Sequence, residues 1–533
     1  MKFNYLQRPL AILTLAALAA CGGGGSTPPR ALAPTPIVTP SGGVQLVGIG
    51  DSLTFGEQAD GLLGQAVPSV TSSLSSYPGN LVPAGQESGF WALLYMQLTG
   101  TTAAQMATGT TSPLPLIAGP GLGSQLVINA TSLFASVQSG CDTFNQAAYG
   151  SSSWSSTRIS AGTQNYDLGV PGITMHEAVA MTGPLTGPPN APNCGYKVLA
   201  NDPTSGGLQS LVSGESGAFY PVMGSYVGAV TSPTELNVAV ALKPKLATVW
   251  LGANDVLKFA FSGGNPVASD TTTQMQADLT QIIKSLTATG TKVLVADLPT
   301  ILTAPQFFPQ GNRLIADLAT LLTPGFGGNV SEATAAATAI SSYVSTQYGV
   351  TTGGYLTESG FLDIVSNCSA SPTTCLTPEL DPSGTGSGLG AYYITPALAT
   401  QINQLNAAYN EVIDAVASGS GSSVALVPIN QIFSALAPST TVPNSATNLN
   451  TIISGAPSAT FQFGGNLVSW DGLHPSNLGY AVIANEFIST ADTAFGMTIA
   501  PLTNTQLATI AAEDPYNGTN IDTALGEAVF PLP

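Results

Sequence analysis

The feature of this sequence that most constrains its fold is the alternation of short apolar runs with longer segments of helical periodicity. Five apolar runs have the length of strands: Val44–Ile49, Tyr166–Val170, Leu246–Leu251, Lys292–Ala296 and Val424–Pro428. Four segments carry apolar residues at helical spacing: Gly89–Leu98, Thr273–Leu286, Ala397–Ala417 and Leu478–Phe495. This alternation predicts an α/β fold with an open, mostly parallel sheet and helices on both faces.

The intervals between these elements are uneven, and no repeat of fixed period joins them. Three long stretches are rich in Gly, Ser, Thr and Pro and predict loops, at about residues 58–164, 186–232 and 303–395. We interpret them as insertions on one α/β domain that spans residues 44–533. Long loops of this kind often form lids or binding surfaces.

The first 43 residues predict export and a lipid anchor. Lys2 and Arg8 form a positive segment around the start of the apolar run Pro9–Ala20, which is shorter than the about 20 residues that span a bilayer. The run ends in Leu-Ala-Ala-Cys21, which resembles the lipobox of bacterial lipoprotein signals. That resemblance implies a signal peptide over residues 1–20, acylation of Cys21, and an outer-membrane location, since Gly22 rather than Asp follows. Residues 21–43 would then carry the lipid and form a flexible tether. The alternative is an ordinary secretory signal.

The composition excludes one class of partner. The chain has 29 acidic and 11 basic residues, for a net charge of −18, and such a balance repels phosphate backbones. We therefore expect no nucleic-acid partner. Hydrophobic residues make up 44% of the chain and charged residues only 8%. A large core can be buried, and a surface solvated mainly by Ser, Thr, Asn and Gln favours an exported protein.

The cysteine and histidine counts also agree with export. Apart from Cys21, the chain has an even set of cysteines, which suits disulfides: Cys141, Cys194, Cys368 and Cys375. Of the three possible pairings we favour those nearest in sequence, 141 with 194 and 368 with 375. The chain has only two histidines and no C-x-x-C, so a zinc site lacks ligands. We expect neither a metal nor a cofactor.

A hydrolytic site needs a base that titrates near pH 7, and the two histidines are the candidates. His474 lies three residues after Asp471, at the start of a predicted helix, where the carboxylate can reach the imidazole Nδ1 and fix its tautomer. His176 lies at another predicted helix start, and we interpret it as a structural or surface residue.

The candidate nucleophile is Ser52, which follows the first apolar run and a turn built on Gly48 and Gly50. A serine at the carboxyl end of a strand, opening a helix, faces the crevice where open α/β sheets bind ligands. Its own backbone N–H can join an oxyanion hole.

Four short blocks, in order, resemble the SGNH/GDSL family of serine esterases and lipases. They are Gly50-Asp51-Ser52-Leu53, Leu168-Gly169-Val170-Pro171-Gly172, Gly252-Ala253-Asn254-Asp255 and Asp471-Gly472-Leu473-His474. The resemblance implies a three-layer α/β/α SGNH-hydrolase (flavodoxin-like) fold and a catalytic triad of Ser52, Asp471 and His474. It also implies an oxyanion hole made by the Ser52 N–H, the Gly172 N–H and the Asn254 side-chain amide.

The chain departs from the family pattern in two places. The second block of the family usually opens with Asn, and Asp167 holds that position here. Ser52 and His474 are also much farther apart in the sequence than in compact members. The resemblance therefore covers the sheet and the site and says nothing about the insertions.

The function that these features predict is hydrolysis of a carboxylic ester, an acyl or lipid ester, through an acyl-enzyme on Ser52 and without a cofactor. One alternative is O-deacetylation of a polysaccharide on the same fold, because an apolar pocket would favour lipids and a shallow polar cleft sugars. A second alternative is a non-catalytic surface-binding lipoprotein. Its groove could be lined by aromatic residues such as Trp91, Tyr95, Phe259, Phe261, Phe307 and Phe308. We expect Trp91 and Tyr95 to lie in the core instead.

Overall fold

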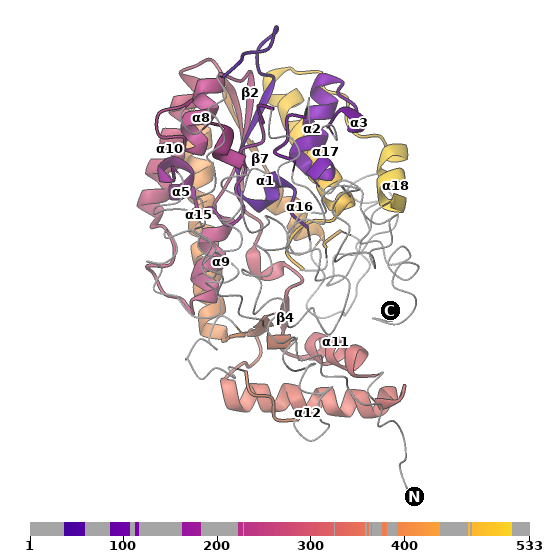
Figure 1. The fold of residues 1–533 in the computed structure, drawn as a ribbon. Helices are drawn as coiled ribbons and strands as arrows, with labels where there is room; N and C mark the ends of the chain where they lie inside the picture. The colour runs from indigo at the N-terminus through magenta and orange to yellow at the C-terminus, as the bar shows by residue number, and fades with distance from the viewer. Residues whose placement is uncertain are drawn as a thin grey trace, which may run out of the picture.

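A computed structural model of the 533-residue chain shows a mixed α/β architecture (Figure 1). The residues that the structure describes are 37–58, 86–106, 112–116, 163–182, 222–226, 229–323, 326–357, 360–361, 364, 376–380, 392–436, 467–469 and 472–513. The predicted signal peptide, Cys21 and the four disulfide candidates lie outside these ranges, as does Asp471.

Four parallel strands form the central sheet in the spatial order β1-β2-β3-β7. They are β1 (Leu46–Gly50), β2 (Leu246–Trp250), β3 (Lys292–Ala296) and β7 (Val424–Val427). Four of the five apolar runs thus form the predicted strands. β1 and β2 are buried along their whole length, as expected for a parallel sheet that helices cover on both faces.

The fifth apolar run, Tyr166–Val170, is extended but is not a regular strand. Asp167 alone makes a parallel bridge, with Gly48 of β1. The Leu168 and Val170 N–H groups donate to the Gly48 and Gly50 carbonyls of β1 (3.0 Å each), while the Gly169 N–H between them donates to the Asp167 side chain (3.0 Å). The segment lies along the edge of β1 that β2 does not occupy. After β1, the chain therefore first places this segment on one side of β1 and later places β2 on the other side. β1 therefore marks a topological switch point, where α/β sheets open a crevice at their carboxyl ends.

Helices cover both faces of the sheet (Figure 1). α2 (Phe90–Thr99) and α17 (Asn477–Phe495) lie on one face. The other face is covered by α8 (Glu235–Leu242), α10 (Thr272–Thr287) and α15 (Pro396–Gly419). The four predicted helices match α2, α10, α15 and α17 to within two residues at each end, whereas α8 was not predicted.

Local capping explains where these helices begin. Thr271, Thr395 and Ser476 are the N-caps of α10, α15 and α17, and each side-chain oxygen accepts a backbone N–H of the first turn. Pro396 occupies the first turn of α15, where its missing N–H costs no hydrogen bond.

Aromatic side chains join α2 and α17 to the sheet. Phe90 stacks on Phe487 with ring centroids 4.6 Å apart, and it meets Trp250 of β2 edge-on at 5.4 Å. All three side chains are buried. Trp91 is also fully buried, as predicted, and stacks on Tyr95, which packs against the same core.

The prediction that the stretch at 303–395 consists of loops was wrong, because it contains regular structure. It holds β4 (Phe307–Pro309), α11 (Asn312–Leu322), α12 (Val330–Tyr348), β5 (Tyr355–Thr357) and β6 (Tyr393–Ile394). The three strands form an antiparallel sheet in the order β4-β5-β6. α11 and α12 pack against each other over a second hydrophobic cluster, in which Phe308 stacks on Phe361. Small alanines supply much of the buried face of α12, and they conceal its periodicity in the sequence.

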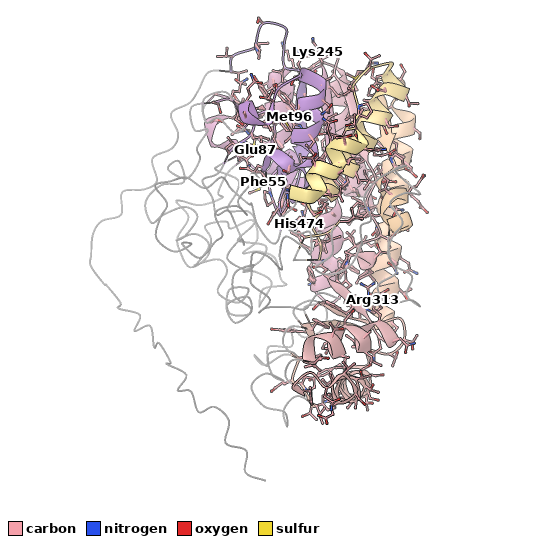
Figure 2. The ribbon with its side chains drawn as sticks, turned by 90° about the vertical axis from the view of Figure 1, so that its right-hand side faces the viewer. Phe55, Glu87, Met96, Lys245, Arg313 and His474 are labelled. Carbon is pink, nitrogen blue, oxygen red and sulfur yellow. The ribbon has the colours of Figure 1, made fainter. Side chains whose placement is uncertain are left out.

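The second cluster lies beyond the carboxyl ends of the parallel strands. Lys245 immediately precedes β2 and marks one end of the molecule, whereas Arg313 of α11 marks the other, with His474 between them (Figure 2). The remaining elements are short: α1 (Ser52–Phe55), η1 (Gln86–Ser88), α3 (Ala103–Met106), α5 (Met175–Ala180), η4 (Gly224–Tyr226), α9 (Ala253–Phe261), η5 (Ile301–Thr303), α16 (Ile429–Leu436) and α18 (Asn504–Glu513). Within the described ranges, no helix has the length and apolarity needed to cross a bilayer.

Candidate active site

Ser52 opens α1 immediately after β1. Asp51 is the N-cap of this four-residue helix, and its Oδ1 accepts a hydrogen bond from the Leu53 N–H (3.0 Å). Gly56 ends the helix with a φ of 80°, in the left-handed region that glycine adopts most easily. The strand, the cap and the tight helix together place the Ser52 hydroxyl at the carboxyl edge of the sheet.

The structure brings His474 to Ser52 across 422 residues of sequence. The His474 Nε2 and the Ser52 Oγ are 2.8 Å apart, within hydrogen-bond distance. Both residues are nearly excluded from solvent, with 2% of His474 and 6% of Ser52 exposed. The remaining member of the predicted triad, Asp471, lies outside the described residues.

The position of His474 is set by the loop that leads into α17. The His474 carbonyl accepts a hydrogen bond from the Ser469 N–H (2.8 Å), and Pro475 forms an antiparallel bridge with Val468. Two contacts then join α17 to the residues after α1. Asn477 accepts a hydrogen bond from the Gln58 side chain (2.8 Å), and the Tyr480 hydroxyl donates to the Glu57 carbonyl (2.7 Å). The residues that follow His474 and those that follow Ser52 are therefore tied together next to the pair.

Gly172 lies in a tight turn that follows the extended segment beside β1. The Ile173 N–H donates to the Val170 carbonyl (3.2 Å), Pro171 occupies the second position, and Gly172 has a φ of 76°. A type II turn requires such a positive φ at its third position, which explains the glycine. The Val170 N–H donates to the Gly50 carbonyl (3.0 Å), so the turn lies beside the end of β1.

Asn254 reaches the same edge from the first turn of α9, directly after β2. Its Nδ2 donates to the Asp51 Oδ2 (3.2 Å) and to the Ile173 carbonyl (3.1 Å). The side-chain amide thus bridges the serine turn and the Gly172 turn. Both of its N–H groups are occupied, so donation to a substrate oxygen requires one of these contacts to be exchanged.

The Asp51 carboxyl group is buried beside this amide. Its burial raises the pKa from 3.8 to about 7, while the Leu53 N–H and the charge of His474 act in the opposite direction. Near neutral pH, Asp51 therefore changes its protonation state while in contact with Asn254.

Two further buried carboxyl groups lie behind the serine turn. Glu235 of α8 accepts a hydrogen bond from the Gly50 N–H (3.0 Å), and Asp167 accepts from Gly169. Burial raises the pKa of both groups well above the ordinary range, and the charges of Asp51 and Asp167 add to the shift of Glu235. Both groups thus hold their protons more tightly than exposed carboxyls do. Glu235 was not recognised from the sequence, whereas Asp167 was noted there as the residue at the usual Asn position of the second block.

A pocket that is partly open to solvent lies beside Ser52 and His474. One wall carries Ala253 and Leu257, which are one helical turn apart on α9. Its other described lining residues are Asp51, Leu53, Asn254, Pro299, Thr300, Ile301, Thr303, Ala304, Phe433 and Leu473. Apart from the catalytic edge and two threonines, these side chains are apolar. The pocket wall had no signal in the sequence, because its segments meet only through tertiary packing.

The other sequence-derived candidates lie away from the pocket. His176 is the second residue of α5, at the predicted helix start, and its ring is half exposed. Phe307 and Phe308 are buried in the two hydrophobic clusters. Among the described residues, no group of three or more His, Cys, Asp or Glu side chains is placed to hold a metal ion.

Comparison of the chain with models of known protein families, with curated proteins and with solved structures found no match.

Proposed function

We propose that this protein is a serine hydrolase that cleaves carboxylic esters through an acyl-enzyme on Ser52. The observation that carries the proposal is the 2.8 Å contact between the Ser52 Oγ and the His474 Nε2 in a buried pair. A nucleophile and a base within hydrogen-bond reach are the minimum for this chemistry. The four sequence blocks supply further support, since the three that fall in described residues converge on one sheet edge.

In the proposed first half-reaction, the Ser52 Oγ attacks the ester carbonyl carbon while the His474 Nε2 takes the hydroxyl proton. The carbonyl oxygen becomes an oxyanion, which accepts hydrogen bonds from the Ser52 N–H, the Gly172 N–H and the Asn254 amide. The tetrahedral intermediate then breaks its bond to the alcohol oxygen, and His474 returns the proton to that leaving group. Asp471, by its place in the fourth block, orients the imidazole through Nδ1.

In the second half-reaction, water attacks the acyl carbon and His474 takes a proton from it. The new tetrahedral intermediate breaks its bond to the Ser52 Oγ, and the proton returns to the serine. The products are the carboxylic acid and the free enzyme. Every proton is carried by His474, so the reaction needs no cofactor.

The apolar pocket wall favours an acyl or lipid ester over an acetylated polysaccharide. Leu257, Ile301 and Phe433 present hydrocarbon surface beside the nucleophile, where an alkyl chain gains from burial and a sugar hydroxyl would lose its water. We therefore assign these side chains to the acyl part of the substrate.

The finer description of the fold and the location belongs to the same proposal. The order of the extended segment, β1, β2, β3 and β7 is similar to that of flavodoxin-like sheets and supports a three-layer SGNH-hydrolase fold. We also propose that the chain is exported and anchored to the bacterial outer membrane through lipids on Cys21, with residues 21–43 as the tether. Its partners would then be an ester substrate and the membrane surface.

The test is hydrolysis of p-nitrophenyl esters of increasing chain length by the full chain and by Ser52→Ala. Ser341→Ala is the matched control, because Ser341 is similarly buried but lies in α12 of the second cluster. We expect activity in the wild type and in Ser341→Ala, and its loss in Ser52→Ala, with circular dichroism showing that all three are folded.

Two results would count against the proposal. Activity that survives Ser52→Ala would mean that another residue is the nucleophile. A folded wild type that cleaves no ester in the series, but releases acetate from an acetylated glycan, would favour the polysaccharide deacetylase. If it cleaves neither, a binding role would become the better reading.

A further inference from the structure

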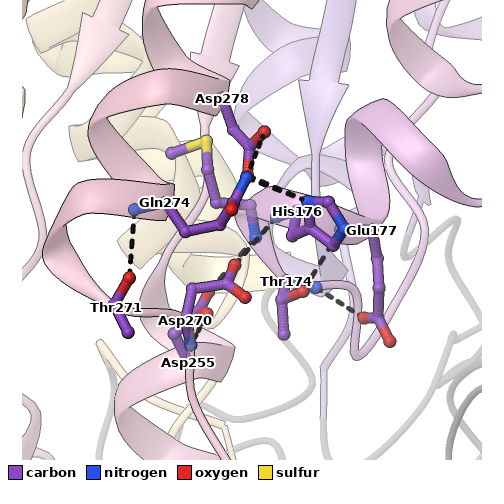
Figure 3. Close-up of polar contacts among 9 residues, drawn as sticks. Thr174, His176, Glu177, Asp255, Asp270, Thr271, Gln274 and Asp278 are labelled. Atoms are coloured by element: carbon purple, nitrogen blue, oxygen red, sulfur yellow. Dashed lines mark hydrogen bonds and ion pairs between the residues drawn. The ribbon is translucent and has the colours of Figure 1, made fainter.

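A cluster of charged and polar side chains holds the start of α5, just beyond the Gly172 turn (Figure 3). Figure 3 shows carboxyl groups of α9 and of the α10 region directed at the first turn of α5. The cluster lies outside the proposed pocket, and the proposed reaction uses none of its side chains. It contacts the segments that carry Gly172 and Asn254, two of the proposed oxyanion donors, and these contacts give it a role.

The carboxyl group of Asp255 holds two segments at once. Its Oδ2 accepts a hydrogen bond from the Met175 N–H (3.2 Å), and its Oδ1 accepts one from the Asp270 N–H (3.2 Å). Asp255 is fully buried. It therefore fastens α9 to the start of α5 and to the segment that precedes α10.

Asn254, the residue before Asp255, contacts the same loop after Gly172. The Asn254 Nδ2 donates to the Ile173 carbonyl (3.1 Å), two residues before the N–H that Asp255 holds. The loop after Gly172 is thus held at both ends of a three-residue stretch by two consecutive residues of α9. Gly172 and Asn254, two of the three proposed oxyanion donors, are connected through these contacts.

The outer part of the cluster acts on α5 through side chains. The His176 Nδ1 lies 3.0 Å from the Asp278 Oδ2, and the Gln274 amide also donates to Asp278. Glu177 caps α5 together with Thr174 and pairs with Lys258 of α9 (3.3 Å). Backbone groups are held as well, since the His176 N–H donates to the Asp270 Oδ2 (3.0 Å) and the Thr174 N–H donates to the Glu177 Oε2 (2.8 Å). Asp278, by contrast, contacts only side chains in this cluster.

We propose that Asp255 is a positioning residue for the oxyanion hole: its carboxyl group sets the separation between the Gly172 turn and the Asn254 amide. This inference rests on the proposed hydrolase function and concerns a residue that the proposed reaction does not use. Burying a carboxyl group is costly unless its hydrogen bonds are made. Here both oxygens hold backbone N–H groups of segments that are otherwise separate in the sequence.

Burial raises the pKa of Asp255 well above the ordinary range, with the charge of Asp270 adding to the shift and that of Lys258 opposing it. The role proposed for Asp255 rests on its two backbone contacts and its burial.

The experiment compares kcat and KM for p-nitrophenyl butyrate in the full chain and in Asp255→Ala, Asp255→Asn and Asp278→Ala. Asp255→Ala removes both acceptors, whereas asparagine retains one acceptor oxygen. Asp278→Ala is the matched control because it removes a buried carboxyl group of the same cluster that holds no backbone N–H. We expect kcat to fall about 100-fold in Asp255→Ala, because a displacement of about 1 Å in a site costs that much. Asp255→Asn should recover part of the loss, Asp278→Ala should stay within about threefold, and KM should change little throughout.

A second readout needs no substrate and separates this inference from the hydrolase proposal. Hydrogen–deuterium exchange over residues 168–178 should accelerate in Asp255→Ala and not in Asp278→Ala. If the wild type is folded but cleaves no ester, the hydrolase proposal fails, while faster exchange only in Asp255→Ala still supports control of the loop by Asp255. Equal exchange in the two variants would overturn the positioning role. So would an unchanged kcat, or a loss of kcat no larger than the loss of folded protein.

Discussion

The Asn254 side-chain amide donates to groups of the protein in the resting state and to the oxyanion in the proposed transition state. In the structure it donates to the Asp51 carboxyl group and to the Ile173 carbonyl. A developing oxyanion carries more charge than a carbonyl, so it is the stronger acceptor for one of these N–H groups. The side chain is therefore held in place before the substrate arrives and needs only an exchange of partner.

Replacing Asn254 with Ala should lower kcat by about 100- to 1,000-fold, because that is the usual cost of losing one oxyanion donor. KM should change little, since the lost interaction is made in the transition state. The measurement is steady-state hydrolysis of p-nitrophenyl butyrate.

Asn485→Ala is a suitable control for this variant. Its side chain donates to the Leu502 carbonyl and accepts from the Leu502 N–H, away from the pocket. Its loss should affect stability rather than kcat. A kcat for Asn254→Ala within threefold of the wild-type value would show that the amide does not serve the oxyanion.

Three turns at the carboxyl edge of the sheet converge on one site. The serine turn follows β1, the Gly172 turn follows the extended segment beside β1, and the Asn254 turn opens α9 after β2. Parallel strands end at a common edge, so short turns after neighbouring strands bring distant residues together. Gly169, in the extended segment just before the Gly172 turn, lies against the Asp51 and Phe55 backbone of the serine turn.

Gly169→Ala should separate these two turns. An added Cβ would lie 2.8 Å from the Asp51 carbonyl oxygen and 2.9 Å from the Phe55 nitrogen, and neither backbone atom can move without shifting α1. We expect a loss of about 1–3 kcal/mol in the free energy of unfolding, the usual cost of overpacking. We also expect kcat to fall at least tenfold in the folded protein.

Chemical denaturation and single-substrate kinetics measure these two effects. Gly100→Ala is the control, because its Cβ would meet nothing within 4 Å, although its φ of 72° makes the alanine strained. Similar kinetics in Gly169→Ala and the wild type would mean that the two turns need not be in contact for activity.

The pocket wall on α9 leads to a prediction about substrate length. Leu257 lies one turn beyond Ala253 and faces the space beside Ser52. Leu257→Trp should fill part of this space and lower kcat/KM for long-chain esters about tenfold or more relative to acetate, since each lost methylene contact costs about 0.8 kcal/mol. The ratio of the two specificity constants is the measurement. An unchanged ratio would place the acyl chain elsewhere.

The sequence predicted the parts of this architecture that depend on local signals. The strand β1 and the helix α17 follow from apolar periodicity, and the contact of Ser52 with His474 follows from motifs at the ends of those elements. α12 was missed because alanine, serine and threonine make up most of it. The pocket contacts of Ile301 and Phe433 were also missed, since they depend on how segments more than a hundred residues apart pack together.

At the scale of the whole molecule, buried carboxyl groups dominate the electrostatics. The net charge is −18, and few cations are available to pair with carboxyl groups inside the fold. Every described carboxyl group with a clearly shifted pKa has a raised one, with burial as the leading cause: Asp51, Asp167, Glu235, Asp255, Asp270, Asp297, Asp317 and Glu486. The folded chain therefore binds protons more tightly than the unfolded chain does.

This imbalance fixes the sign of the pH dependence of stability. In the unfolded chain an aspartate ionises near pH 4, whereas in the folded chain burial raises the pKa of Asp51 to about 7 and that of Asp297 to about 6. Between those values the folded state holds the extra protons. Its stability is greatest at the acidic end of the window and falls as the pH rises through the folded pKa. For Asp51 alone, the shift corresponds to on the order of 4 kcal/mol.

We therefore expect the full chain to have a higher Tm at pH 5 than at pH 8, by roughly 5 °C or more, because each kcal/mol moves the Tm of a large domain by a few degrees. The reduced repulsion among the surface carboxylates at pH 5 acts in the same direction. Thermal unfolding followed by circular dichroism at constant ionic strength measures the difference. In Asp51→Asn the difference should shrink, because asparagine keeps the cap on Leu53 but does not titrate. An equal Tm at the two pH values would mean that folding takes up no net protons, and a higher Tm at pH 8 would mean that it releases them; either result would contradict the prediction.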